Sequence, residues 1–281
     1  MIVSPDLAEF ISRFILDRLS VRRETAGGPC IIGICGAQGI GKTTVTANVA
    51  HRLEALGHKA CILSLDDLYL SLAERQRLAE TVHPLLATRG VPGTHDPQLG
   101  LQLFADCATP GQISVPQFDK ALDDRLPRED WPMVKTPVDV VLFEGWCVGA
   151  MPQSAAALSL AANALERDED PDGVWRGYVN NALATSYQQL FAQLDDLILL
   201  AAPSFEIVAA WRGEQEAGLA QRLGSAADLA RRTMNTDEIA RFVLYYERLT
   251  CHILAEMPSR ASLVLRLDQD RRLIAVEEKT E

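Results

Sequence analysis

The segment Gly36–Thr44 constrains the fold of this chain more than any other part of its sequence. It reads Gly-Ala-Gln-Gly-Ile-Gly-Lys-Thr-Thr and fits the pattern G-x-x-x-x-G-K-[ST], with Gly36, Gly41, Lys42 and Thr43 at the fixed positions. Glycines there let backbone N–H groups close around phosphate oxygens, and a helix that begins at the same point adds the positive end of its dipole. The lysine can reach the β- and γ-phosphates of a nucleotide, and the next hydroxyl can bind Mg²⁺.

The residues on either side of this loop have the pattern that such a loop requires. The apolar run 31–35 before it predicts a buried strand, and Val45, Val49 and Leu53 after it recur at helical spacing. Strand, loop and helix in this order predict an ATP site. The expected contacts are Gly36, Ala37, Gln38, Gly39, Ile40, Gly41, Lys42, Thr43 and Thr44.

The composition of the chain excludes several classes of protein. Hydrophobic residues make up 48% of the 281 positions, which is ample for a folded core, so intrinsic disorder is excluded. The net charge of −11 opposes binding to nucleic acid or to an anionic membrane, so neither partner is expected. An anionic substrate must therefore be bound by local cations and backbone N–H groups.

The cysteines and the N-terminal segment predict a cytoplasmic protein. None of the six cysteines forms a C-x-x-C pair and several lie in apolar runs, so we expect reduced thiols rather than disulfides or a metal site. Charges are interspersed among the apolar residues of segment 5–20, which indicates an amphipathic helix rather than a signal peptide. Since the chain has no run of about 18 apolar residues, no membrane span is expected.

Strand and helix patterns alternate along the chain. Strands are predicted at 30–35, 60–65, 138–143, 197–201, 262–267 and 273–276. Helices are predicted at 5–20, from the phosphate loop to about 56, and at 71–82, 154–166, 175–194 and 204–222, with a start near 228 and a long helix from 236 to just before Pro258. This alternation predicts an α/β fold whose mostly parallel sheet is covered by helices on both faces, in one domain over 1–281 rather than two small ones.

The region 84–137 differs in texture from the rest of the chain. It holds eight of the 14 prolines, and we expect mostly loop there, with a short helix from about 100 and one strand at 112–115. A long loop region inside a compact domain is usually functional or disordered, and its aromatic and charged content favours a substrate loop.

Acidic residues follow two of the predicted strands. Glu144 ends one apolar run and is expected to bind Mg²⁺ together with Thr43, because the carboxyl ends of parallel strands meet the ligand crevice. Asp66 and Asp67 follow another strand at the same edge of the sheet. They could orient a substrate hydroxyl and accept its proton, or they could cap the helix that follows, and the residues alone leave both options open.

The proline-rich region contains polar groups that suit a small hydroxylated substrate. Thr94, His95 and Asp96 lie in a rigid Pro/Gly frame, which favours hydroxyl recognition, although a surface turn would have the same composition. Lys120 and Arg125 put cations in the same loop system and suit a substrate carboxylate. A solvated charged loop is the alternative for this pair.

Six segments occur in the order found in one known family. They are Gly36–Thr44, Ser64–Tyr69, Arg89–Asp96, Val115–Lys120, Phe143–Trp146 and Trp211–Glu216. With them the chain resembles the plant- and fungal-type D-glycerate 3-kinases and their bacterial relatives, which belong to the phosphoribulokinase, uridine kinase and pantothenate kinase group. The resemblance covers roughly residues 28–255, and its Pro-Gly-Thr-His-Asp and Phe-Glu-Gly-Trp pieces are far more specific than the phosphate loop.

The resemblance implies a P-loop fold with a five-stranded parallel core and an ATP- and Mg²⁺-dependent kinase. Its catalytic residues would be Lys42 at the phosphates, Asp66 at the acceptor hydroxyl, and Arg212 in a lid over 203–222, where the alternative is a plain amphipathic helix. The implied and expected substrate contacts are Asp67, Tyr69, Thr94, His95 and Asp96, with Lys120 or Arg125 for a carboxylate.

The expected acceptor is D-glycerate, phosphorylated on its primary hydroxyl to 3-phosphoglycerate. The region 84–137 is too short and too poor in aromatic residues to enclose a nucleobase, while its cations suit a carboxylate. A nucleoside, pantothenate or a sugar is the alternative acceptor. A GTPase would carry an N-K-x-D motif, which the chain lacks, and a motor ATPase on nucleic acid would carry a basic track.

Overall fold

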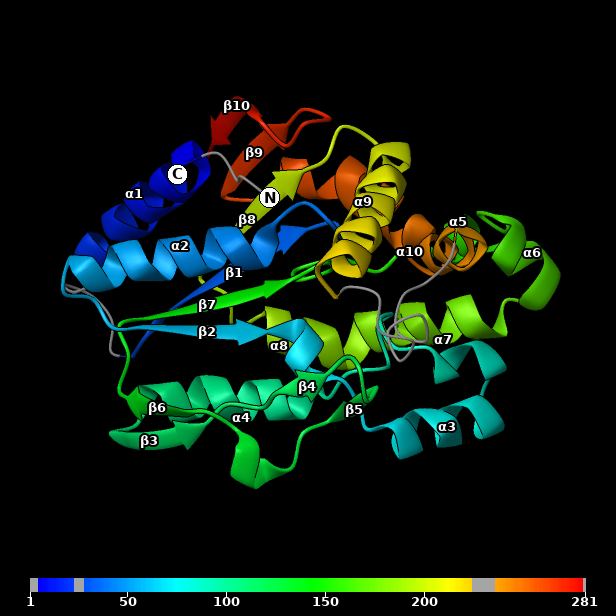
Figure 1. Cartoon of the computed structure of the whole chain (residues 1–281), viewed down its shortest axis with the longest axis horizontal. Coiled ribbons are helices and arrows are strands. Elements are labelled where there is room, and N and C mark those ends of the chain that lie inside the picture. Colours follow the sequence, from blue (N-terminus) through cyan, green and yellow to red (C-terminus); the bar gives the residue numbers. More distant parts are fainter. Residues whose placement is uncertain (1–4, 23–27, 224–235, 280–281) are drawn as a thin grey trace.

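The computed structural model describes residues 5–22, 28–223 and 236–279. The central sheet contains β1 (Cys30–Gly36), β2 (Ala60–Ser64), β7 (Val140–Gly145), β8 (Asp196–Ala201), β9 (Leu263–Leu267) and β10 (Leu273–Glu278). The strand order is β10-β9-β8-β1-β7-β2, and every pair is parallel except β10 with β9 (Figure 1). The predicted α/β fold with a mostly parallel sheet is confirmed, and antiparallel β10, predicted as a strand at 273–276, adds a sixth strand to the five-stranded parallel core that the resemblance implied.

Helices cover both faces of the sheet (Figure 1). They are α1 (Pro5–Arg22), α2 (Lys42–Ala55), α3 (Leu72–Thr81), α4 (Pro97–Ala108), α5 (Ala155–Leu158), α6 (Ala164–Glu169), α7 (Val174–Ala182), α8 (Gln188–Phe191), α9 (Phe205–Leu223) and α10 (Thr236–Glu256). Alternate residues of β7 enter opposite cores, with Val140 and Leu142 beside α1 and α2, and Val141 and Phe143 beside α4 and α8. Burial on both faces explains why this strand reads as a continuous apolar run.

Two predicted helices are interrupted. The span 154–166 forms the short helices α5 and α6, because the Asn163 side chain accepts the backbone N–H of Glu166 and starts a new helix. The span 175–194 forms α7 and α8 with one π-helical turn, Leu183–Tyr187, between them. The helix start predicted near 228 lies outside the described residues.

The region 84–137 holds more regular structure than its sequence predicts. The expected helix extends over α4, and the expected strand β3 (Gly111–Ser114) pairs with β6 (Met133–Thr136). A second small hairpin joins β4 (Phe118–Asp119) to β5 (Asp124–Arg125). These two-residue strands have no hydrophobic period of their own, so pattern analysis could not find them.

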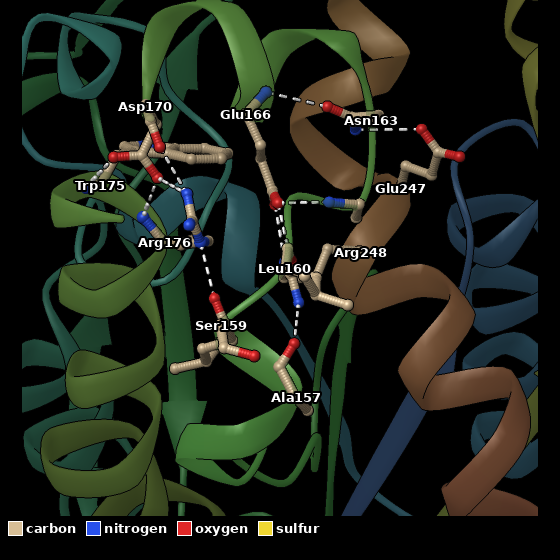
Figure 2. A network of polar contacts seen from close by, with 12 residues as sticks. Ala157, Ser159, Leu160, Asn163, Glu166, Asp170, Trp175, Arg176, Glu247 and Arg248 are labelled. Atoms are coloured by element: carbon tan, nitrogen blue, oxygen red, sulfur yellow. Dashed lines mark hydrogen bonds and ion pairs between the residues drawn. The ribbon is translucent and has the colours of Figure 1, made fainter. Parts of the chain in front are cut away.

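Two buried ion pairs tie the segment around α6 to its neighbours (Figure 2). Asp170 accepts from Arg176 at 2.9 Å, and Glu166 accepts from Arg248 of α10 at 2.6 Å. Glu166 and Asp170 are each 1–2% exposed, so removing either arginine would leave a buried carboxylate without its cationic partner. The network therefore holds α10 against the rest of the domain.

The middle of α10 reaches the loop 89–96, here called the acceptor loop. Tyr246 packs edge-on against Trp146 and donates a hydrogen bond to the carbonyl of Arg89 at 3.2 Å. Trp146 in turn donates to the carbonyl of Gly90 at 2.8 Å. The Phe-Glu-Gly-Trp segment is thus joined to the Pro-Gly-Thr-His-Asp loop.

None of the helices in the described ranges is long and apolar enough to cross a membrane.

Candidate active site

The phosphate loop runs from the end of β1 into the first turn of α2. Gly39 and Gly41 have φ angles of 76° and 98°, in the left-handed region that disfavours a side chain. A Cβ atom on Gly36 would lie 3.1 Å from Leu200, so a side chain at this position would be tightly packed. No side chain caps α2 at Gly41, which leaves its first N–H groups to face an anion.

The two side chains at the start of α2, Lys42 and Thr43, contact the phosphate loop and the end of β7. The ammonium of Lys42 donates to the carbonyl of Ala37 at 3.1 Å, and the exposed Thr43 hydroxyl donates to Oε1 of Glu144 at 2.9 Å. The hydroxyl of Ser64, at the end of β2, lies 3.4 Å from the same carboxylate oxygen. Three hard oxygen ligands therefore gather beside the loop, a donor set that fits Mg²⁺.

Asp66 and Asp67 lie in the short 3₁₀ turn Leu65–Leu68 after β2, and they have different partners. Asp66 accepts the Tyr69 hydroxyl at 2.9 Å and the Lys120 ammonium at 2.7 Å. Asp67 accepts the backbone N–H of Phe118 at 3.0 Å.

Neither aspartate caps α3. The cap is Ser71, which forms a capping box with Glu74, so the helix-cap alternative for the two aspartates is wrong. Both carboxylates instead contact the region 84–137, Asp66 through Lys120 and Asp67 through the N–H of Phe118.

The pKa of Asp66 is lowered from its ordinary value, and the pKa of Asp67 is raised. Burial raises the pKa of Asp66, but Lys120, Lys42 and the Tyr69 hydrogen bond outweigh it and hold the pKa at about 2. Burial raises the pKa of Asp67 to about 6, against the N–H of Phe118 that lowers it. Neighbouring carboxyl groups with separated pKa values are typical of sites for proton transfer.

The acceptor loop packs against the turn that holds Asp66. An antiparallel bridge joins Tyr69 to His95, and their rings stack with centroids 4.5 Å apart. The His95 side chain is 3% exposed, and burial lowers the pKa of its imidazole to about 3, so the ring is neutral. Tyr69 is also buried and donates its hydroxyl to Asp66, so it positions that carboxylate, and its predicted contact with the substrate stays a prediction.

Thr94 and Asp96 have structural roles. The Thr94 hydroxyl is fully buried, donates to the carbonyl of Val91 at 2.7 Å and accepts the N–H of Gly90 at 3.0 Å. Its burial contradicts the surface-turn alternative, whereas its contact with the substrate stays a prediction. Asp96 accepts the N–H of Leu99 at 3.0 Å and caps α4.

Lys120 and Arg125 lie on the small hairpin of β4 and β5. The Lys120 side chain is 61% exposed and ends on Asp66. Arg125 donates twice to the carbonyl of Tyr69, at 2.7 and 3.1 Å, so its guanidinium holds the chain that follows Asp66. Of the two cations predicted for a substrate carboxylate, Lys120 is the one with an exposed side chain beside the carboxylate of Asp66.

Helix α9 packs directly on the phosphate loop. A Cβ atom on Gly39 would lie 2.8 Å from Cβ of Trp211, and Trp211 is anchored by a 2.8 Å hydrogen bond to the carbonyl of Gln269. Arg271, in the turn between β9 and β10, donates to the carbonyl of Gly39 at 2.8 Å and lies over the Trp211 ring. Helix and loop are thus joined through two side chains.

Arg212 follows on the same helix. Its guanidinium lies 5.0 Å from the ring centroid of Phe242, and Gln38 of the phosphate loop belongs to the same group of neighbouring residues. The residue predicted for the lid is therefore next to the expected ATP site.

No family model matches the chain. The chain is 32% identical over 250 residues to the uncharacterized kinase mug58 of Schizosaccharomyces pombe, with 85% of this chain and 86% of that protein covered. It is 28% identical over 261 residues to the chloroplastic D-glycerate 3-kinase of Arabidopsis thaliana, with 88% of this chain and 54% of that protein covered. The chain belongs to the mug58 and D-glycerate 3-kinase family of P-loop kinases.

A solved structure of the family has the same fold. The D-glycerate 3-kinase from Cryptococcus neoformans var. grubii superposes with a TM-score of 0.79 at 24% identity, covering 97% of this chain and 99% of that chain. The family match makes this chain a P-loop kinase for a small molecule, as its sequence resemblance predicted, and the solved structure confirms the fold.

Sequence patterns missed two side chains of the candidate active site in this chain. Ser64 adds a hydroxyl beside Glu144, and Tyr187 contacts His95 at 2.6 Å from a helix 92 positions later. Ser64 immediately follows an apolar strand, a signal that could have been used. Tyr187 lies in a helical stretch and has no local signal.

Proposed function

We propose that this kinase transfers the γ-phosphoryl group of ATP to the primary hydroxyl of D-glycerate, with Mg²⁺ as cofactor, and forms 3-phosphoglycerate. The observation that carries the proposal is the ion pair between Asp66 and Lys120. A candidate base and an exposed cation lie side by side, so one small molecule could present its hydroxyl to the first and its carboxylate to the second. The names of the plant and fungal relatives support the same acceptor.

On the nucleotide side, the loop N–H groups and Lys42 would bind the phosphates. Thr43 and Glu144 would hold Mg²⁺, which neutralises charge on the β- and γ-phosphate oxygens when it is bound. The contact between these two side chains supports this role, because it places a hydroxyl and a carboxylate at the start of α2. Arg212 would add a cation from α9.

On the acceptor side, the substrate would compete with Asp66 for Lys120. A carboxylate that draws the ammonium away removes the main group that lowers the pKa of Asp66, so that pKa rises from about 2. The carboxylate then becomes a better acceptor for the substrate's hydroxyl proton as the oxygen attacks the γ-phosphorus. A neutral acceptor lacks the charge needed to release Lys120, which favours hydroxy acids over sugars.

The aromatic residues near Asp66 also disfavour a nucleoside. Tyr69 stacks on His95 at 4.5 Å and meets Phe118 edge-on at 5.1 Å. These rings are packed on one another, so they leave no slot between them for a nucleobase.

The test is an ADP-release assay of the purified protein with a panel of acceptors. The panel holds D-glycerate, L-glycerate, glycerol, a hexose, a nucleoside and pantothenate, and Lys42→Ala serves as the inactive control. We expect the highest kcat/KM with D-glycerate and a phosphorus NMR spectrum of 3-phosphoglycerate. A neutral sugar, a nucleoside or pantothenate that exceeds D-glycerate by about tenfold would contradict the proposed acceptor and leave the kinase assignment intact.

A further inference from the structure

Tyr187 is a buried residue behind the acceptor loop to which the proposed reaction gives no role. It ends the π-helical turn between α7 and α8 and is 1% exposed. Its hydroxyl oxygen lies 2.6 Å from Nδ1 of His95 and accepts the backbone N–H of Gly93 at 3.0 Å. The contact joins this helical turn to His95, whose ring stacks on Tyr69, the residue that donates to Asp66.

The partners of the Tyr187 hydroxyl determine the direction of its hydrogen bond to His95. A tyrosine hydroxyl has one hydrogen to donate and accepts through its lone pairs. The Gly93 N–H donates to the oxygen at 3.0 Å, and burial raises the pKa of Tyr187 while the backbone N–H groups of Gly93 and His95 lower it. Within the described ranges the hydroxyl has one remaining partner, Nδ1 of His95, and it must therefore donate to that nitrogen.

The direction of this bond determines the tautomer of His95. The ring is neutral, because burial holds its pKa at about 3. A neutral imidazole that accepts at Nδ1 carries its hydrogen on Nε2. That Nε2 atom is buried and has no hydrogen-bond partner in the part of the chain that the structure describes. A buried N–H without a partner is rare in proteins and indicates that a ligand atom binds there.

The surroundings of the ring place that ligand on the acceptor side of the site. His95 stacks on Tyr69, whose hydroxyl holds Asp66, and the negative charge of Asp66 acts on the imidazole. A neutral N–H donor suits this position, because a charged imidazolium would pair with Asp66 and compete for the same carboxylate.

We propose that Tyr187 is a positioning residue that fixes the Nε2–H tautomer of His95, and that this N–H donates to an oxygen of the acceptor substrate. The chemical class of the ligand atom is a carboxylate or hydroxyl oxygen, and its assignment to a hydroxy acid rests on the proposed function. Sequence patterns suggested His95 as a contact, whereas the donor state of its ring and the part of Tyr187 in fixing it follow from the tertiary contacts alone.

The tautomer is tested by NMR on the full chain labelled with ¹⁵N-histidine. Long-range ¹H–¹⁵N correlations at neutral pH distinguish the two tautomers, and the His95→Gln spectrum identifies the signals of His95 among the five histidines. We expect the Nε2–H form for His95, and we expect the Nδ1 signal to shift in Tyr187→Phe. An Nδ1–H tautomer in the unmodified protein would overturn the proposal whatever the acceptor is.

The positioning role is tested by kinetics with the best acceptor of the panel. Tyr187→Phe should raise KM for the acceptor about tenfold, the loss of one good hydrogen bond, with KM for ATP unchanged. Tyr178→Phe is the matched control, because Tyr178 also packs on Gly93 but no contact joins it to His95 in the described structure. A folded Tyr187→Phe enzyme with the same KM as the control would overturn the role of Tyr187.

Two substitutions of the histidine complete the test. A glutamine amide places a donor near the position of Nε2, whereas an asparagine amide places one near Nδ1. His95→Gln should therefore keep more acceptor affinity than His95→Asn, and the reverse order would contradict a donor at Nε2. If D-glycerate fails as acceptor but the tautomer and this order hold with another one, the proposed substrate is wrong and the role of Tyr187 stands.

Discussion

The ammonium of Lys120 lies 2.7 Å from Oδ2 of Asp66, a residue 54 positions earlier in the chain. The pair joins a flexible, exposed cation to the candidate base of the reaction. It lowers the pKa of Asp66 and keeps the carboxylate ionised, yet it also occupies the oxygen that a substrate hydroxyl would approach. Under the proposed reaction, a negatively charged acceptor draws Lys120 away and so frees this oxygen for the substrate hydroxyl.

Lys120→Ala should raise KM for D-glycerate by about tenfold to a hundredfold, the usual scale for a hydrogen bond to a charged group. KM for glycerol should change by less than about threefold, since a neutral acceptor does not use the ammonium. Without Lys120 the pKa of Asp66 rises, so the acid limb of kcat/KM should move to higher pH. Equal effects on both acceptors would show that Lys120 does not bind the carboxylate.

Asp66→Asn should lower kcat by about a hundredfold or more, which is the usual contribution of a general base. KM for ATP should stay almost unchanged, because the nucleotide is held by the phosphate loop. Asp67→Asn should cost less, since Asp67 accepts the backbone N–H of Phe118. Steady-state kinetics of both variants decide the point, and the opposite ranking would assign the base to Asp67.

Asp67→Asn should also stabilise the folded protein at neutral pH. The folded-state pKa of Asp67 is raised from 3.8 to about 6, so protonation favours the folded state below pH 4 and this benefit is lost as the pH rises through 6. The uncharged amide removes that loss, which is worth about 1–2 kcal/mol after allowance for solvent screening. Chemical denaturation at pH 4 and 7.5 should show the gain only at the higher pH.

Glu144→Gln should raise the Mg²⁺ concentration needed for half-maximal rate. An amide is a poorer ligand for a hard cation than a carboxylate, while it can still accept the Thr43 hydroxyl. The rate is measured against Mg²⁺ at fixed ATP. An unshifted curve with a normal maximal rate would place the metal ligand elsewhere in the site.

Arg248→Met should lower the free energy of unfolding by about 3–5 kcal/mol, because it leaves the buried carboxylate of Glu166 without its partner. The exposed pair of Arg167 and Asp168 offers a matched control, and Arg167→Ala should change stability by less than about 0.5 kcal/mol. Adding Glu166→Gln to Arg248→Met should recover part of the loss. Similar values for the two arginine variants would show that the network in Figure 2 does not stabilise the fold.

Local patterns in the sequence were sufficient to predict the phosphate loop and the elements around it. The phosphate loop, its flanking strand and helix, and the carboxylate that ends β7 are each encoded within a few residues, and parallel pairing brings strand ends together. Hydrophobic period likewise predicted most of the sheet. It failed at 154–166, where the polar cap Asn163 starts a new helix inside a stretch of good helix formers.

The acceptor half was decided by tertiary structure. Thr94, His95 and Asp96 look alike in sequence, but packing makes one a loop brace, one a buried neutral ring and one a helix cap. Lys120 meets Asp66 across 54 positions and Tyr187 meets His95 across 92. Such pairs have no periodic signal, because side-chain partners this far apart are selected by how helices and hairpins pack, whereas strands, loops and caps are selected by neighbours within one or two turns.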